Sequence, residues 1–471
     1  MTDFLISADT DDLFTLQTGD TYNLLAGVTH RNDDADWLLD VVGSGADLHV
    51  SGVMLNFGIP DGVGGGAIRV GEDAHEVTLT LTDRTASTIF SSGSAPVLEV
   101  LGDRFTLHND TFLDGPGIHV SGDHAVISNT HFITGGLGGT VIAPALILDG
   151  AQAMFHSTGV ILGTLGIQAR SDGHIVSGAI QADMAIDIAW DTAPGGRITI
   201  SDAITSDTVA IRGSASFGDR ITIDSGAFVD GQIQTRGGDD LIINNGQVFN
   251  VIDTGAGNDT VFHKAFETED VYLGTGADRY VAKGDAVSLV GVFGEDGTDR
   301  LIGAGGDDAL FGGADHDFLK GKGGEDLLEG GAGNDTLKGG DFSDFLDAGT
   351  GDDLLFGGSR NDVLDGGAGN DTLDGGRDDD TLTGGADADA FVVALRRNGS
   401  DKITDFGDGA DVLDMTAFGL QNLNRLKLSG ALSNTIDGVV IDLDVLRGAR
   451  DGEITLTGVT ITDLEAADFL F

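Results

Sequence analysis

Between residues 294 and 392 an apolar residue recurs at every ninth position, and an aspartate stands two positions before each one. This stretch divides without a gap into eleven nonapeptides, whose eighth residue is leucine ten times and phenylalanine once. Glycines early in each unit permit positive φ angles at no steric cost. Each unit therefore predicts a six-residue turn and a three-residue strand, with the eighth residue inward and its two neighbours outward.

Such a short strand cannot bury an apolar side chain alone, so the units are expected to stack and to align their leucines in one internal column. Two nonapeptides per coil give a flattened parallel β-roll with turns along two edges. We name the edge that begins with the turn at 294–299 the first edge, and the edge that begins with the turn at 303–308 the second edge.

A longer period precedes the roll. Residues 98–112 and 118–132 align at a spacing of twenty, and β-rich segments recur further on at intervals of roughly 19–23 residues. The aligned pairs are Gly102/Gly122, Asp103/Asp123, Asn109/Asn129 and Phe112/Phe132. Two short strands in each coil of this length predict a parallel β-helix, for which residues 1 to about 40 would cap the open end.

The fold class that follows is all-β: a right-handed parallel β-helix continuing into a parallel β-roll, with a C-terminal β cap. The predicted boundaries are 1–235 for the β-helix with its cap, 236–293 for transitional coils, 294–392 for the roll and 393–471 for the C-terminal region. No Pro- or Ser-rich hinge interrupts the transition, so we expect one continuous rod.

Composition narrows the possible partners. The 471 residues carry 77 acidic and 25 basic side chains, a formal charge of −52, which argues against nucleic acid and anionic membranes and favours cations. The N-terminus lacks the basic and apolar regions of a signal peptide, and no run of about 18 apolar residues predicts a membrane span. Seventy-six glycines argue against long helices, and a chain without cysteine forms no disulfide.

The sixth residue of every nonapeptide is aspartate. Stacked turns would hold these side chains only about 5 Å apart, so an unneutralised column repels itself. Ca²⁺ resolves the conflict because it takes about six to eight oxygen ligands, which carboxylates and turn carbonyls supply, whereas Mg²⁺ demands stricter geometry. Similar turns recur upstream of the roll at an interval of 19. The predicted metal ligands are Asp240, Asp259, Asp278, Asp299, Asp308, Asp317, Asp326, Asp335, Asp344, Asp353, Asp362, Asp371, Asp380 and Asp389.

The segments GGAGNDTLK at 330–338 and GGAGNDTLD at 366–374 resemble the nonapeptides of the repeats-in-toxin (RTX) family of secreted calcium-binding proteins. The resemblance implies Ca²⁺ between turns of the same edge, bound by the sixth-position aspartate and by turn carbonyls. The candidate carbonyl donors are Gly331, Gly333, Gly349, Gly351, Gly367 and Gly369. Because Phe342 and Arg360 replace the fourth-position glycine on the second edge, we expect that edge to be loaded only in part and the first edge fully.

The C-terminal region indicates export. Residues 399–415 resemble the segment that follows the roll in secreted RTX proteins, and the end of the chain, from Asp468 to Phe471, resembles the uncleaved signal read by type I exporters. A final strand that caps the roll would explain the same residues, and both can hold. We expect an extracellular or surface-associated protein that stays unfolded in the calcium-poor cell and folds in millimolar Ca²⁺ outside.

The β-helical half offers one weak catalytic cluster. It contains no HExxH motif, no GxSxG nucleophile elbow and no DPHE motif of the kind found in alginate epimerases. Arg104, His119, Asp123, His124 and His131 lie in adjacent predicted coils and could share a face. Stacked Asp and Asn ladders at coil corners, with solvated histidines, would explain the same residues, and we favour that interpretation.

Two functions agree with these features. The first is a secreted calcium-binding structural or adhesive protein, of the biofilm-matrix or surface-layer type, that associates with itself or bridges to extracellular polysaccharide. The second is a polysaccharide lyase or epimerase with a catalytic β-helix and the roll as its secretion module. The missing motifs, and the absence of lysine before Lys264, favour the first.

Overall fold

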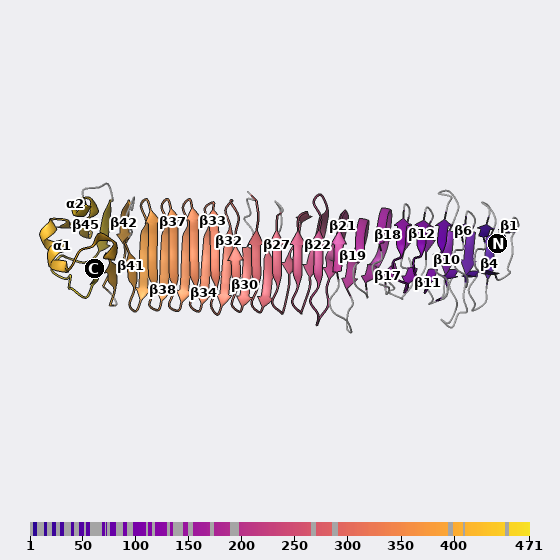
Figure 1. The fold of residues 1–471 in the computed structure, drawn as a ribbon, viewed down its shortest axis with the longest axis horizontal. Helices are drawn as coiled ribbons and strands as arrows, with labels where there is room; N and C mark the ends of the chain where they lie inside the picture. The colour runs from indigo at the N-terminus through magenta and orange to yellow at the C-terminus, as the bar shows by residue number, and fades with distance from the viewer. Residues whose placement is uncertain are drawn as a thin grey trace. The chain divides into compact units, whose positions relative to one another are not determined.

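The computed structural model describes residues 197–471 except 265–269, 285–290, 394–398, 408–409 and 448–451, and before residue 197 the strands given below with a few adjoining turn residues. The chain divides into two compact units, Met1–Thr254 and Gly255–Phe471. Within each unit, short strands follow one another in parallel stacks (Figure 1). The predicted all-β parallel solenoid is confirmed.

The N-terminal part of the first unit has three stacks of strands. The first contains β1 (Asp3–Ile6), β3 (Thr21–Leu24), β6 (Asp47–Val50), β9 (Thr78–Leu81), β12 (Thr106–Asn109) and β15 (Val126–Asn129). The second contains β2 (Phe14–Leu16), β5 (Leu39–Val41), β8 (Ile68–Val70), β11 (Leu98–Val100), β14 (Ile118–Val120) and β17 (Leu146–Leu148). The third contains β4 (Thr29–Asn32), β7 (Val53–Asn56), β10 (Thr88–Ser91), β13 (Phe112–Asp114) and β16 (Phe132–Thr134).

The prediction of two strands per coil is therefore wrong for these coils, which have three. Asn109 and Asn129 end their strands, and Phe112 and Phe132 lie on two further strands that pair with each other. A period of twenty fixes the length of a coil but not its number of corners. Residues 3–41, expected as a cap, contribute strands with the same parallel pairing as those that follow.

Two long strands follow in the first unit. β18 (Met154–Ala169) pairs in succession with β15, β16 and β17, and β19 (His174–Ile188) pairs with β18. Beyond them one stack contains β20 (Arg197–Ile200), β22 (Arg220–Ile223) and β24 (Leu241–Asn244). The other contains β21 (Ala203–Arg212), β23 (Phe228–Gln234), β25 (Gln247–Val248) and β26 (Ile252–Asp253).

The second unit contains the nonapeptide roll. Its strands form two stacks in which each strand pairs in parallel with the one a coil further on, as Leu319 pairs with Leu337. One stack contains β27 (Thr260–His263), β29 (Arg279–Ala282), β31 (Arg300–Ile302), β33 (Phe318–Gly323), β35 (Thr336–Asp341), β37 (Leu354–Ser359), β39 (Thr372–Arg377) and β41 (Ala390–Val392). The other contains β28 (Val271–Thr275), β30 (Gly291–Asp296), β32 (Ala309–Ala314), β34 (Leu327–Ala332), β36 (Phe345–Thr350), β38 (Val363–Ala368) and β40 (Thr381–Ala386).

The eighth-position residues form the core of the roll. From Leu301 to Leu373 these leucines are fully buried, and their seventh and ninth neighbours are half-buried or exposed. The alternation expected for a strand with one inward face thus holds along both stacks.

The last part of the second unit closes the stacks with a mixed cap. It contains β42 (Ser400–Ile403), β43 (Val412–Asp414), η1 (Thr416–Phe418), α1 (Leu423–Ser429), β44 (Leu432–Asn434), β45 (Gly438–Asp442), α2 (Leu443–Arg447), β46 (Glu453–Thr457) and β47 (Phe469–Leu470). β42 and β43 extend the two stacks, whereas β44, β45 and β46 form an antiparallel meander over their end. No helix of the described residues is long and apolar enough to cross a membrane.

Candidate metal centres on the two edges of the roll

Two columns of buried aspartates run along the edges of the roll. In each column the backbone N–H of one aspartate donates to Oδ1 of the aspartate one coil further on, as Asp335 does to Asp353 at 2.6 Å. The first-edge column consists of Asp259, Asp278, Asp299, Asp317, Asp335, Asp353, Asp371, Asp389 and Asp411. The second-edge column consists of Asp308, Asp326, Asp344, Asp362, Asp380 and Asp401. Oδ1 thus ties each turn to the next.

The other carboxylate oxygen, Oδ2, is buried with no hydrogen-bond partner in the described part of the chain for most of these side chains. They are Asp299, Asp317, Asp326, Asp335, Asp344, Asp353, Asp362, Asp371 and Asp380. Leaving a buried acceptor without a donor costs about 1–3 kcal/mol, and more when the group is charged. The columns therefore need a cation or protons to neutralise them.

Burial raises the pKa of the column aspartates from Asp299 to Asp380 above the ordinary value. The pKa rises to about 8 in Asp317 and Asp362 and to about 6 in Asp299 and Asp353. Loss of solvent is the largest cause, and the neighbouring aspartates of the column add to it in Asp317 and Asp362. A bound cation reverses this preference because its charge stabilises the carboxylates.

Backbone carbonyls lie close to the buried carboxylate oxygens. A Cβ on Gly330 would lie 2.6 Å from Asp335 Oδ2 and 2.7 Å from the carbonyl oxygen of Ala348, in the next turn of the first edge. Asp335 Oδ2 and the Ala348 carbonyl oxygen thus border one narrow space beside the Cα of Gly330. Among the described residues, no three His, Cys, Asp or Glu side chains converge, so a cation would take much of its coordination from carbonyls. Such an all-oxygen set suits Ca²⁺.

The six glycines named as carbonyl donors all have positive φ, between 94° and 137°. They are Gly331, Gly333, Gly349, Gly351, Gly367 and Gly369. A Cβ on Gly333 would lie 1.9 Å from the carbonyl oxygen of Asp315 in the preceding turn, so a side chain here would force the turns apart. Glycine is needed for the close stacking of turns as well as for their conformation.

On the second edge, Phe342, Arg360 and Asp378 stand in place of the fourth-position glycine, and all three hold positive φ. Phe342 and Arg360 both hold φ at 82°, a left-handed conformation that costs a non-glycine residue roughly 1–2 kcal/mol. The aspartates of the same turns, Asp344 and Asp362, nevertheless keep their positions in the column. Both turns therefore retain the carboxylate geometry of the glycine-containing turns.

The turn of Asp308 is different. Its Oδ2 accepts a hydrogen bond from the backbone N–H of Ala304 at 2.6 Å. Burial raises the pKa of Asp308 to about 6, and the Ala304 N–H and the nearby ammonium of Lys322 partly oppose that rise. Lys322 Nζ donates to the carbonyl oxygens of Gly303 at 2.5 Å and Ala282 at 3.5 Å. A tethered cation thus already contacts the carbonyls at this end of the second edge.

Three column residues were not predicted from the sequence. Asp401 and Asp411 extend the two columns into the cap, and in the first unit the N–H of Asp219 donates to Asp240 Oδ1 at 2.5 Å. Each of the three precedes an apolar residue by two positions, at Ile403, Leu413 and Ile221. That aspartate–apolar pair, without the fixed interval of nine, was the signal that could have identified them.

The candidate catalytic residues of the β-helix contact different partners. Arg104 forms an ion pair with Glu76, and His124 is exposed on the turn one coil further on. His119 lies on β14 with Nε2 3.3 Å from Ser121 Oγ, and the N–H of Asp123 donates to Asp103 Oδ1 at 2.9 Å.

Asn109 Nδ2 donates to Asn129 Oδ1 at 2.6 Å inside the coil, which makes the Asn pair a buried ladder. His131 lies outside the described residues.

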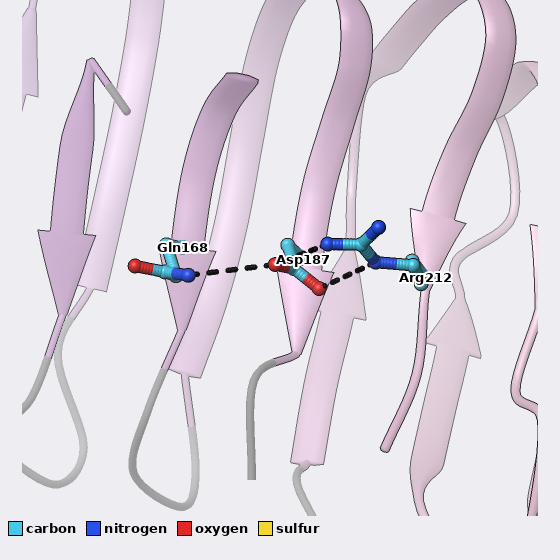
Figure 2. Close-up of polar contacts among 3 residues, drawn as sticks. All are labelled: Gln168, Asp187 and Arg212. Carbon is cyan, nitrogen blue, oxygen red and sulfur yellow. Dashed lines mark hydrogen bonds and ion pairs between the residues drawn. The ribbon is translucent and has the colours of Figure 1, made fainter. Parts of the chain in front are cut away.

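Figure 2 shows a polar ladder that the sequence did not reveal. Asp187, which is buried, accepts two hydrogen bonds from Arg212, from Nε at 2.9 Å and from Nη2 at 2.8 Å, and a third from Gln168 Nε2 at 3.4 Å. The three residues lie on β18, β19 and β21 in one register row. Their spacings of 19 and 25 are too unequal to stand out as a repeat.

Comparison with known proteins agrees with the geometry of the columns. A family model of the RTX calcium-binding nonapeptide repeat matches four copies, at residues 249–265, 293–328, 329–359 and 356–391. The roll of this chain is therefore built from RTX-type calcium-binding repeats. Proteins with these repeats are typically secreted. No curated protein matches the chain.

Proposed function

We propose that this RTX protein is an extracellular structural or adhesive component, of the biofilm-matrix or surface-layer type, whose roll folds when Ca²⁺ enters the aspartate columns. The observation that carries the proposal is the set of nine buried Oδ2 atoms named above, for which the described part of the chain supplies no hydrogen-bond partner. Until a cation binds, each of these turns buries an unsatisfied acceptor, and neighbouring turns repel one another. Ca²⁺ bound by the carboxylates and the glycine carbonyls would remove both penalties.

The sites are predicted to differ in occupancy. On the first edge, we assign Ca²⁺ to the spaces between successive turns from Asp259 to Asp389. On the second edge, we assign it to the turns from Asp326 to Asp380. The Asp308 turn takes none, because Ala304 and Lys322 already supply a donor and a cation there.

Calcium binding would also determine when the chain folds. Extracellular calcium modules bind with Kd values of about 10⁻⁴–10⁻³ M, which suits millimolar Ca²⁺ outside the cell. Each independent site at ten times its Kd contributes about 1.4 kcal/mol, so several sites add up to roughly the stability of a whole domain. The ion acts here as a folding switch, and a type I exporter would receive the chain unfolded.

The experiment is calcium titration of the metal-stripped full chain, followed by circular dichroism and calorimetry. We expect β-structure to increase with calcium uptake and to be lost again in chelator. Identical spectra with and without Ca²⁺, together with no heat of binding, would overturn the proposal. Release of unsaturated products from alginate or pectate would instead support the polysaccharide lyase alternative.

A further inference from the structure

The two flat faces of the roll carry opposite chemistry. Both are formed by the seventh and ninth residues of the nonapeptides, which flank the buried leucine. We define the basic face, on β31, β33, β35 and β37, by Arg300, Phe318, Lys320, Lys338, Leu354 and Phe356. We define the acidic face, on β34, β36 and β38, by Leu327, Glu329, Phe345, Asp347, Val363 and Asp365.

The basic face is unusual in a chain with a net charge of −52. Lys320 is the direct register neighbour of Lys338, and no ion pair joins either lysine to an acid in the described part of the chain. Arg300 lies 4.1 Å from the ring centroid of Phe318, and Lys338 lies 4.8 Å from that of Phe356. The aromatic rings hold the cations on the sheet, where they form a compact positive surface.

The acidic face carries the complementary pattern. Leu327, Phe345 and Val363 form a column of apolar side chains that are 38%, 44% and 40% exposed. A second column beside it holds Glu329, Asp347 and Asp365, each the register neighbour of the next. Like charges opposite one another on a sheet are destabilising, so this column favours a positively charged partner.

We propose that the basic face of one copy packs against the acidic face of a second copy, so that the folded protein assembles sideways into open ribbons. The inference rests on the proposed calcium-driven folding, because only a folded roll presents either face. The two contacting surfaces are different, so the contact is heterologous. Each added copy therefore leaves one of its two faces free to bind the next copy.

The axial repeat makes a second copy the best-fitting partner. Both faces advance one coil for every eighteen residues, as the pairs Leu319/Leu337 and Leu328/Leu346 show. Sheets that pack face to face lie about 10 Å apart. Because the coils of both faces have the same spacing along the stack, the lysines of one copy can lie opposite the acids of the next. An acidic polysaccharide would cover the basic face alone and leave the apolar column of the acidic face exposed.

The test uses two charge-swapped full-length variants in the presence of Ca²⁺. Lys320→Glu/Lys338→Glu makes both faces acidic, and Asp347→Lys/Asp365→Lys makes both faces basic. We expect the wild type to form ribbons by electron microscopy and light scattering, each variant alone to stay monomeric, and an equimolar mixture of the two to assemble again. Arg377→Glu/Arg425→Glu, at the end of β39 and on α1, is the control. It lowers the net charge as much as Lys320→Glu/Lys338→Glu does but lies outside both faces, so it should assemble as the wild type does.

Circular dichroism and calorimetry on the same samples separate the two proposals. Calcium uptake and folding without wild-type assembly, or assembly of each variant alone, would overturn the face-to-face contact and leave calcium-driven folding intact. Failure to bind Ca²⁺ would overturn both. A monomeric wild type that binds immobilised alginate, with binding lost in Lys320→Glu/Lys338→Glu, would replace the second copy with an anionic polysaccharide.

Discussion

At the scale of single residues, most column aspartates have two tasks: one carboxylate oxygen accepts a backbone hydrogen bond, and the other is available for a cation. Asp335 shows the division: Oδ1 accepts the N–H of Asp317 in the preceding turn, and Oδ2 is buried and available for a cation. A carboxamide in its place could keep the first contact but would lose the charge. The two tasks can therefore be separated by one substitution.

We expect Asp335→Asn to lower the number of bound Ca²⁺ ions and the stability gained from calcium, while the metal-free protein changes little. The loss should be about 1.4 kcal/mol for one independent site at ten times its Kd. Calorimetric titration and thermal unfolding with and without Ca²⁺ measure both quantities. Asp437→Asn, on an exposed turn of the cap, is the control. An unchanged calcium stoichiometry in Asp335→Asn would exclude Asp335 as a ligand.

Lys322 occupies the position where other turns of the second edge have Gly340, Gly358 and Gly376, and it holds φ at 90°. Lys322→Gly should remove that strain and free the carbonyl oxygens of Gly303 and Ala282. We expect the variant to bind one additional Ca²⁺ ion and to depend more strongly on calcium for folding. Lys264→Gly, at an exposed position after β27, should keep the wild-type stoichiometry. If Lys322→Gly also kept it, Lys322 would not be standing in for a cation.

At the scale of the strand and its turn, the sequence was informative where the repeat was constant. The nonapeptides fixed register, inward residues and edges, because one interval governed all eleven units. Asp401 and Asp411 escaped notice because the intervals to their column neighbours widen to 21 and 22 residues at the cap. The reach of the Lys322 side chain and the third strand of the N-terminal coils are set by three-dimensional packing, which no interval in the sequence reports.

The aspartate columns predict an unusual pH dependence in the absence of metal. Burial raises the pKa of Asp326 to about 8 and that of Asp344 to about 7, so the folded roll holds protons that the unfolded chain releases from about pH 4 upward. Protons stabilise the folded state only while they are bound. Metal-free roll should therefore be most stable in acid and should lose stability as the pH rises from about 4 to about 8.

Circular dichroism of the metal-stripped protein in chelator, at pH 5 and at pH 8, checks this prediction. We expect more β-structure at pH 5. With Ca²⁺ present the order should reverse, because protons compete with the ion for the same carboxylates. Equal metal-free spectra at the two pH values would show that the columns do not control folding.

The ladder in the first unit predicts a stability effect that does not depend on calcium. Arg212→Leu would leave the buried carboxylate of Asp187 without its charged partner. Because the Arg212 side chain is 37% exposed, we expect a loss smaller than the about 3–5 kcal/mol of a fully buried pair. Asp187→Leu/Arg212→Leu should recover much of that loss, since it removes both charges. Denaturant unfolding in chelator isolates the effect from the roll. Equal stability of the single and double variants would show that Asp187 is not held by Arg212.

At the scale of the whole molecule, the proposed export segment is also part of the folded cap. Leu413 N donates to the carbonyl oxygen of Asp468, and Met415 N donates to that of Leu470, so β47 is held by β43. β43 pairs with β41, and the N–H of Asp389 donates to Asp411 Oδ1 one residue before β43 begins. The C-terminal strand thus depends on the end of the first-edge column.

This dependence predicts that Ca²⁺ binding buries β47, which belongs to the proposed signal for a type I exporter. Without Ca²⁺ the column repels itself, β43 loses its support, and the amides of β47 should exchange with solvent rapidly. With Ca²⁺, we expect hydrogen exchange of Phe469 and Leu470 to slow together with that of the roll strands. Asp411→Ala, which removes the acceptor for the Asp389 N–H at the end of the column, should release β47 while the roll remains protected. Equal protection of β47 with and without Ca²⁺ would mean that the cap folds independently of the columns, and the exporter would then meet a signal that is already buried inside the cell.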